Sequence, residues 1–303
     1  MVRRRRSGKG VAGLILCFAV IAVFYILHPV ETKDNSPGGN VPTSAVEALS
    51  DLDGDLVVSF IDVGQGDSIL LEQGEETMLI DCGPASSQGQ LLDYLSEREL
   101  DTIDYLVLTH PHEDHIGGAV AILESYPVEA VYMPDKTHTT STYGDTLDAI
   151  RNQQLTVTTA QAGDRFSLGD ATVEIVGPVS ISNDLNNCSI VLRLAYEDVA
   201  FLFTGDAEAQ EEADILNNGL DVQADVLKVG HHGSSSSTYQ DFLEAVDPEI
   251  AVISCGEGND YGHPHQETLD RLYSSHISTF RTDEQGTILA ISDGQTVTIY
   301  TER

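Results

Sequence analysis

Histidines and acids are packed closely in residues 108–118, which read LTHPHEDHIGG. His110 and His112 are two positions apart and could converge on one ion, whereas Asp114 and His115 turn toward a second position. Neutral imidazoles and a carboxylate suit zinc, manganese or iron(II). Imidazoles this close would repel one another if protonated, and a metal removes that repulsion by holding them neutral. The motif therefore predicts a metal centre.

Two further motifs supply donors. Asp206 lies in LFTGDAE, at the turn after a hydrophobic strand, where its carboxylate could bridge two ions. The alternative is an N-cap aspartate for a helix that begins at Ala207. His231 and His232 are adjacent in LKVGHHGSSS, so their side chains point apart and only one should bind metal. We assign that role to His231 and expect His232 to contact substrate.

A last motif, YGHPHQE, places His263 and His265 on either side of Pro264, ahead of a predicted helix. His263 and His232 are candidates for binding phosphate oxygens or protonating a leaving group, although His263 could simply belong to a structured loop. The predicted metal ligands are His110, His112, Asp114, His115, Asp206 and His231. These suffice for two divalent ions, zinc or manganese, that share Asp206 and a bridging hydroxide. Such ions, about 3.5–4 Å apart, stabilise both the attacking and the leaving oxygen in hydrolysis.

Strands and helices must position these motifs. Strand-like runs are predicted at 56–61, 77–80, 105–108, 171–176, 190–195, 199–203, 250–253, 287–291 and 296–300. Helical patterns cover roughly 88–98, 115–125, 143–153, 207–217, 238–246 and 266–274. Early hairpin-like pairs mixed with crossover helices indicate an α/β fold with mixed sheets. The histidines then follow the carboxyl end of a strand, the edge where α/β sheets bind ligands. Gly117 and Gly118 should let the next helix pack closely against neighbouring backbone.

The N-terminal segment indicates a membrane anchor. Residues 11–27 form an uncharged apolar run, VAGLILCFAVIAVFYIL, at the short end of the range for a membrane helix. The basic residues before it should stay cytoplasmic, which places the rest of the chain outside. A cleaved signal peptide has the same outline, but no A-x-A-like site follows. We expect residues 1–30 to be a basic tip and signal anchor, 31–54 a flexible linker and 55–303 one hydrolase domain, secreted if the anchor is cut.

Charge limits the partners of the chain. The formal net charge is -34, with 49 acidic against 15 basic residues. Such a surface repels polyanions at long range, which counts against indiscriminate nucleic-acid binding, although bound metal ions can reverse the local sign. Outside the apolar run there are three cysteines, Cys82, Cys188 and Cys255, too few for a disulfide framework. No protein partner can be inferred.

The motifs together resemble a known family. HPHEDH is similar to the HxHxDH signature of the metallo-β-lactamase-fold hydrolases. DVGQGDS, LIDCG, LFTGD, LKVGHHGS and YGHPH occur in the order found in the C-terminal domain of ComEC-type DNA-uptake proteins, over about residues 55–300. The resemblance implies an αββα sandwich with a dimetal site at one edge. It assigns His110, His112 and Asp206 to one ion, and Asp114, His115, Asp206 and His231 to the other. Asp62, Asp67 and Asp81 match positions that support such a site.

The chain departs from the superfamily pattern in one place. Many members have a further metal-binding histidine where this chain reads NDLNNCS, at 183–189. Asn187, Cys188 or Ser189 occupies that stretch, as in the ComEC-type pattern. The first metal is therefore expected to lack one protein ligand, and a water or a substrate oxygen would complete it. A Cys188 thiolate is the alternative.

These observations predict a metal-dependent hydrolase that cleaves phosphodiester bonds with a dimetal-bound hydroxide. Single-stranded nucleic acid and a small phosphodiester, such as a phosphocholine or wall ester, are the expected substrates. The expected single membrane segment counts against DNA transport by this chain alone. A lactonase or β-lactamase-like hydrolase is one alternative, and a non-catalytic metal-binding domain is another.

Overall fold

Two β-sheets form the centre of residues 55–303, the part of the chain that the computed structural model describes. The first sheet has the order β15-β14-β1-β2-β3-β4-β5-β6, and the second has the order β13-β12-β11-β10-β9-β8-β7. The strands of the first sheet are β1 (Leu56–Phe60), β2 (Ile69–Gln73), β3 (Glu76–Ile80), β4 (Ile103–Val107), β5 (Val128–Met133), β6 (Val157–Thr159), β14 (Ile288–Ser292) and β15 (Val297–Thr301). Those of the second are β7 (Arg165–Leu168), β8 (Ala171–Gly177), β9 (Val191–Tyr196), β10 (Val199–Phe203), β11 (Val226–Lys228), β12 (Ile250–Ile253) and β13 (Ser278–Arg281).

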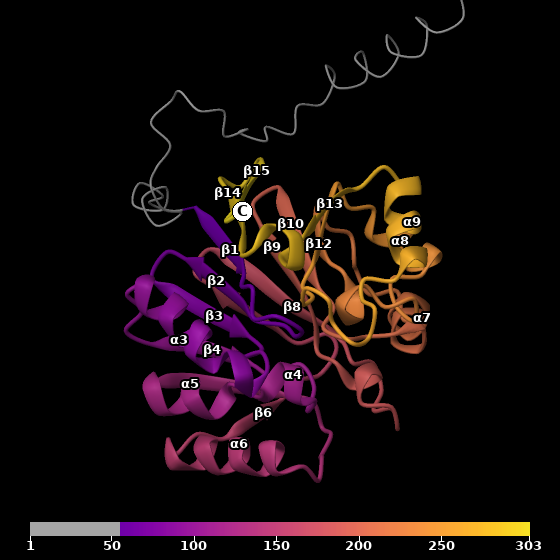
Figure 1. Cartoon of the computed structure of the whole chain (residues 1–303). Coiled ribbons are helices and arrows are strands. Elements are labelled where there is room, and N and C mark those ends of the chain that lie inside the picture. Colours follow the sequence, from indigo (N-terminus) through magenta and orange to yellow (C-terminus); the bar gives the residue numbers. More distant parts are fainter. Residues whose placement is uncertain (1–54) are drawn as a thin grey trace, which may run out of the picture. The chain divides into compact units, whose positions relative to one another are not determined.

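Helices cover the outer face of each sheet (Figure 1). Apolar residues of the first sheet pack against α3 (Gln88–Glu97), α4 (Glu113–Ile116), α5 (Ala119–Ser125) and α6 (Ser141–Asn152). Those of the second pack against α7 (Ala209–Asn217), α8 (Gln240–Val246) and α9 (Gln266–Ser274). A third apolar cluster lies between the two sheets. The predicted αββα sandwich is therefore confirmed.

Strand β10 shows why the apolar runs form buried strands. All five of its residues are buried, because successive side chains enter different layers. Phe201 and Phe203 belong to the core between the sheets, whereas Ala200 and Leu202 face the helices. Each buried phenylalanine contributes roughly 1.5–3 kcal/mol to folding.

Parallel strands bring the motifs to one edge of each sheet. Strand β4 runs parallel to β3 and β5, and β10, β11 and β12 are parallel to one another. Because Ile80 pairs with Val107, the residues that follow β3 and β4 emerge side by side. Phe203 likewise pairs with Lys228, so the segments after β10 and β11 are neighbours.

The predicted helix at 115–125 is two helices in the structure. Helix α4 ends at Ile116 and α5 begins at Ala119. The interruption coincides with a close approach, since a Cβ atom on Gly117 would lie 2.3 Å from the backbone nitrogen of Ala85. Gly117 thus lies against the η1 turn (Ala85–Ser87) and Gly118 against Cys82, so both glycines pack closely against neighbouring backbone, as predicted.

The predicted membrane anchor at 11–27 and linker at 31–54 lie outside the described residues. Within 55–303, the structure has no helix with the length and apolar character needed to cross a bilayer.

Candidate metal centre

Loops after β1, β3 and β4 are joined backbone to backbone at the edge of the first sheet. Asp67 N donates to Asp114 O at 3.2 Å, and Gly83 N donates to Asp67 O at 2.8 Å. Cys82 N donates to His115 O at 2.7 Å. These backbone hydrogen bonds hold the main chain of Asp114 and His115 in place independently of their side chains.

Glycine allows these loops to approach so closely. A Cβ atom on Gly66 would lie 2.3 Å from Asp114 O, and one on Gly118 would lie 2.4 Å from Cys82 O. Gly66 also has a positive φ of 147°, which side chains rarely tolerate. The glycines of GQGD and IGG therefore act through backbone packing.

Asp206 is the point on which the histidines converge. It follows β10 and is buried. Its Oδ1 lies 3.3 Å from His115 Nε2 and 3.5 Å from His232 Nε2. Its Oδ2 lies 3.7 Å from both His110 Nε2 and His231 Nε2. One carboxylate thus faces two sets of imidazoles, one on each oxygen.

Two groups of donors share Asp206. In each group the potential ligand atoms all lie within 4.8 Å of one another. The first group consists of His110, His112 and Asp206, and the second of Asp114, His115, Asp206 and His232. Five of the six predicted ligands are therefore brought together, in the two sets that the family resemblance implied.

The donors fit a pair of divalent ions. His115 Nε2, His232 Nε2 and Asp206 Oδ1 are buried and have no hydrogen-bond partner among the described residues. Buried polar atoms are costly unless they are paired or bind a metal. All three belong to the second donor group and point at one another, which is the arrangement expected around a cation. Imidazole and carboxylate donors suit zinc or manganese.

His231 and His232 differ in placement from the sequence expectation. His232 is the member of the pair whose Nε2 joins the second donor group. His231 instead places its Nδ1 3.0 Å from Glu208 Oε1, and its side chain is 22% exposed. Both residues have a left-handed backbone, with φ of 47° and 54°. His231 Nε2 also approaches Asp206, but His231 belongs to neither donor group, and residue order alone does not reveal this difference.

The segment at 183–189 supplies no ligand to the first group. Asn187 Oδ1 accepts hydrogen bonds from the backbone of Glu208 and Glu211. Cys188 Sγ donates toward Ser182 O and Asp184 O, and the Cys188 side chain is outside the donor group. Within the described residues the first group therefore has three donors and is open to a further oxygen.

Ser189 lies behind His110 and does not reach the donor group itself. Its Oγ is 3.3 Å from His110 Nδ1 and accepts a hydrogen bond from Asp206 N. It thus links a ring of the first group to the backbone of the shared aspartate.

Buried aspartates hold two of the ligand rings from behind. Asp81 Oδ2 lies 2.7 Å from His115 Nδ1, and Asp81 also accepts hydrogen bonds from Thr109. Asp67 Oδ1 lies 3.3 Å from His232 Nδ1. Contacts of this kind orient a ligand and fix its tautomer.

Asp62 is placed differently from the other two predicted supports. It accepts a hydrogen bond from Gly64 N and pairs with Arg303 at 2.6 Å. It therefore stabilises a turn and ties down the C-terminus.

His263 lies beside the second group. Its ring centroid is 5.3 Å from that of His231 and 6.2 Å from that of His232. It is buried, and its Nδ1 has no partner among the described residues. Burial and the neighbouring His231 and His232 lower the pKa of His263 to about 4, so the ring is neutral near pH 7.

The two donor groups differ in protonation when no ion is bound. Burial and the neighbouring His115 hold the pKa of His110 well below its usual value. Burial also opposes the charged form of His232, but Asp206 and Asp67 outweigh it and raise that pKa to about 10. Burial is outweighed in the same way at His115, where Asp206 and Asp81 raise the pKa.

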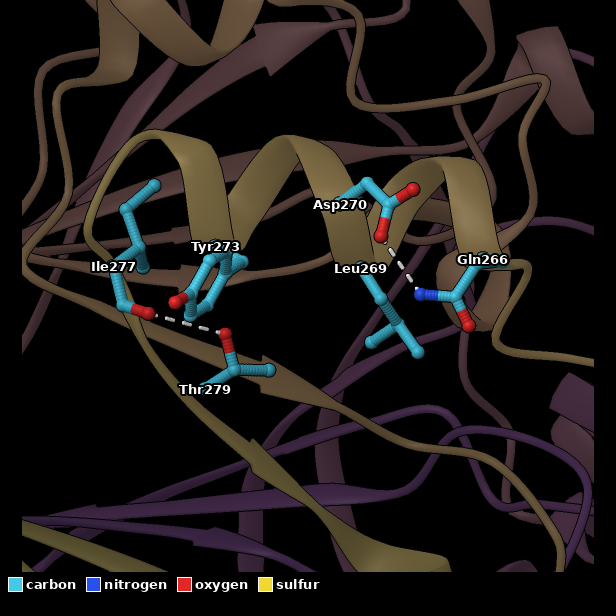
Figure 2. Close-up of a pocket in the computed structure, with 6 residues that line it drawn as sticks. All are labelled: Gln266, Leu269, Asp270, Tyr273, Ile277 and Thr279. Carbon is cyan, nitrogen blue, oxygen red and sulfur yellow. Dashed lines mark hydrogen bonds between the residues drawn. The ribbon is translucent and has the colours of Figure 1, made fainter. Parts of the chain in front are cut away.

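A hollow between α9 and β13 is separate from this centre (Figure 2). It is lined by Gln266, Leu269, Asp270, Tyr273, Ile277 and Thr279. Gln266 Nε2 donates to Asp270 Oδ1 at 2.8 Å, which occupies the polar groups of its rim. It contains none of the donors described above.

Comparisons with known proteins agree with this geometry. Residues 61–257 match the model of a family described as the metallo-beta-lactamase superfamily. The chain is 32% identical over 250 residues to ComE operon protein 3 of Bacillus subtilis. This alignment covers 76% of this chain and 32% of that protein. It is 33% identical over 224 residues to recombination protein 2 of Haemophilus influenzae, with coverage of 71% and 26%. The chain thus spans about a third or less of the length of these curated relatives.

The fold also matches a solved structure. The metallo-beta-lactamase fold protein YhfI from Bacillus subtilis aligns with a TM-score of 0.55 at 12% identity, and the match covers 78% of this chain and 100% of that chain. At that identity the likeness concerns the fold alone. The sequence matches confirm the resemblance that the motifs predicted.

Proposed function

This chain belongs to the metallo-beta-lactamase superfamily and is a metal-dependent hydrolase at that level, and from this premise we propose that it cleaves phosphodiester bonds. The observation that carries the proposal is the position of Asp206 between two donor groups, the first with three donors and the second with four among the described residues. A substrate oxygen could complete the first group while the second keeps its four donors. The name of the Haemophilus relative, recombination protein 2, also favours a nucleic-acid type of diester.

The residues of the first group would hold one ion through His110, His112 and Asp206. Those of the second would hold another through Asp114, His115, Asp206 and His232. When bound, such a pair activates a water molecule as nucleophile and stabilises the negative charge that develops on the phosphoryl oxygens. The assignment of His232 in place of His231 follows from the geometry described above.

Asp114 is the donor best placed to handle the proton of the nucleophile. Its side chain is 29% exposed, whereas those of His115 and His232 are 0% and 1% exposed. Its Oδ2 lies 3.3 Å from His232 Nε2, so the carboxylate stands between the buried donors and solvent. We assign it both a ligand and a catalytic role.

His263 and His231 form the side of the centre that would contact substrate. Their rings meet edge to face, and Glu208 orients His231 through its Nδ1. Imidazole N–H groups at this position would donate hydrogen bonds to phosphoryl oxygens. His263 thus keeps its predicted substrate role, and His231 takes the role predicted for His232.

The acidic composition favours short or small substrates over long duplexes. The chain carries 49 acidic and 15 basic residues, so a long polyanion would be repelled except where bound ions reverse the local charge. We therefore propose a small phosphodiester or a short single strand as substrate.

A substrate panel tests this proposal. The purified chain, loaded with zinc or manganese, is offered bis-p-nitrophenyl phosphate, single-stranded DNA, p-nitrophenyl phosphorylcholine, nitrocefin and an acyl lactone. We expect cleavage of at least one phosphodiester and no cleavage of the last two. Cleavage of nitrocefin or lactone with every diester left intact would contradict it.

The location of the enzyme is a second proposal, which rests on sequence alone. We propose that residues 11–27 anchor the chain in the cell membrane and hold the hydrolase domain outside the cytoplasm. Protease added to intact cells should then digest the domain. Full protection of the domain in intact cells, with digestion after lysis, would contradict this topology.

A further inference from the structure

We propose that Lys228 is a positioning residue of the metal centre, which acts through a buried ion pair with Asp67 to hold His232 toward the second donor group. The inference rests on the metal centre of the proposed function and is independent of the substrate. Lys228 touches none of the donors itself, so its effect must be transmitted by Asp67.

The ion pair is fully enclosed. Lys228 Nζ lies 2.8 Å from Asp67 Oδ2, and the two side chains are 0% and 2% exposed. The ammonium group also donates to Val229 O at 3.0 Å. Lysine is almost never fully buried unless it is paired. Its position at the end of β11, deep in the sandwich, therefore requires Asp67.

Asp67 connects this pair to the ligand ring. Its second oxygen, Oδ1, lies 3.3 Å from His232 Nδ1, which also lies 3.0 Å from Ser254 O. Asp67 Oδ1 makes no hydrogen bond among the described residues and acts on the ring through its charge at ion-pair distance. His232 Nδ1 donates its proton to Ser254 O, which leaves the Nε2 lone pair free in the neutral ring. That Nε2 is the atom that faces Asp114 Oδ2 at 3.3 Å.

The backbone at His232 explains why the ring needs this support. Its φ of 54° is a left-handed conformation that is uncommon for non-glycine residues, so contacts that hold the segment matter here. The η3 turn (Gly230–Gly233) that contains it follows directly after β11. Lys228 anchors the start of the segment and, through Asp67, also anchors its ring.

The ion pair also joins the two sheets. Lys228 ends a strand of the seven-stranded sheet, whereas Asp67 lies in the loop between β1 and β2 of the eight-stranded sheet. The same loop is bonded to Asp114 through the Asp67 backbone. Asp67 thus contacts two residues of the second group. Its main chain is hydrogen-bonded to Asp114, and its side chain lies beside the ring of His232.

Metal counting in charge-deleted variants tests the proposal. Lys228→Met removes the ammonium group and keeps an unbranched side chain of similar length. The full chain is dialysed against defined free zinc or manganese, its metal content is measured by mass spectrometry, and affinities are measured by calorimetry. We expect two ions in the wild type and an affinity for the second ion that is about 10- to 100-fold weaker in the variant.

A double variant separates positioning from stability. Lys228→Met alone removes the ammonium partner of the buried Asp67 carboxylate and should lower the melting temperature of the metal-free protein. Lys228→Met/Asp67→Asn removes both charges and should recover much of that loss. We expect its affinity for the second ion to stay weak, because the carboxylate that held His232 is gone. Two ions bound with wild-type affinity by the double variant would overturn the proposal, whether or not the single variant folds.

A matched control uses an ion pair remote from the centre. Arg98 and Glu72 lie 2.8 Å apart and are also mostly buried. Arg98→Met should leave both ions bound with wild-type affinity. Equal losses in Arg98→Met and Lys228→Met would overturn a specific role for Lys228. Because no substrate is involved, these results are independent of whether any phosphodiester is cleaved.

Discussion

His115 Nδ1 lies 2.7 Å from Asp81 Oδ2, and both side chains are completely buried. The carboxylate accepts the Nδ1 proton and thereby turns Nε2 toward Asp206, 3.3 Å away. A ligand that is held in this way loses little freedom when it binds a cation. The relationship leads to a first prediction.

Asp81→Asn should weaken metal binding without unfolding the chain. Asparagine tolerates the positive φ of 59° at this position, so the substitution mainly removes the negative charge behind His115. We expect about 10- to 100-fold weaker affinity for one ion, measured by calorimetry, with an unchanged circular dichroism spectrum. Wild-type affinity in this variant would show that the carboxylate charge is unimportant.

Asp114→Ala should abolish hydrolysis of whichever substrate the panel identifies. The side chain is partly exposed, so its removal should leave the fold intact. We expect a loss of at least about 100-fold in kcat. Glu113→Ala is the matched control, because this exposed neighbour belongs to neither donor group. Full activity of Asp114→Ala would mean that the centre has been misplaced.

Metal binding should release protons, and the second ion should be the more sensitive to pH. Carboxylates raise the pKa of His232 to about 10 and also raise that of His115, so both rings are protonated near pH 7 when no ion is bound. Protons then compete with the ion, and its affinity must increase as the pH rises. His110, whose pKa is lowered, releases no proton.

Calorimetry in buffers of different ionisation enthalpy counts these protons. We expect up to two per molecule in the wild type and one fewer in His232→Ala. The same count in both proteins would rule out His232 as the proton source.

Stability should depend on pH through a buried glutamate of α7. Burial raises the pKa of Glu212 to about 7, although its carboxylate accepts hydrogen bonds from the backbone of Thr238 and Tyr239. The folded state therefore binds a proton more tightly than the unfolded state. This contribution to stability is fully present below the unfolded pKa near 4.5 and is lost as the pH rises through about 7.

Glu212→Gln should remove that dependence. The stability of the variant relative to the wild type should be roughly 1–3 kcal/mol more favourable at pH 8 than at pH 5. Thermal unfolding of the metal-free protein at the two pH values measures the difference. Glu124→Gln, at an exposed position, is the control. Equal shifts at both pH values would contradict the assignment.

The sequence was informative where chemistry depends on residues at strand ends. His110 and Asp206 fall just after the carboxyl ends of β4 and β10, and parallel pairing brings the ends of neighbouring strands together. The run VAFLF of β10 was predicted correctly, because it contains a β-branched and two aromatic residues and is soon followed by a glycine. Short or mixed runs were missed. Strands β2 and β5 were not predicted, because a few apolar residues do not distinguish a strand from a buried turn of helix.

The roles of His231 and His232 could not be read from residue order. Both rings approach Asp206, but only His232 joins a donor group, and the two consecutive left-handed residues that place the rings are seen only in the folded backbone. Glu208 and Lys228 were not singled out for a related reason. Each contacts a histidine or aspartate that is distant in the sequence or follows a turn, so no local pattern signals the contact. For Glu208, its position two residues after Asp206 is the one feature of the sequence that points to a place near the centre.

The close backbone contacts around Gly66 and Gly118 constrain how this enzyme can change over evolution. The loops are held by peptide groups, so a different cation or substrate can be accommodated by exchanging side chains on an unchanged frame. An inserted residue in any of the three loops, by contrast, would displace several ligands at once. Specificity in such a protein is free to diverge quickly, while the spacing of its glycines is not.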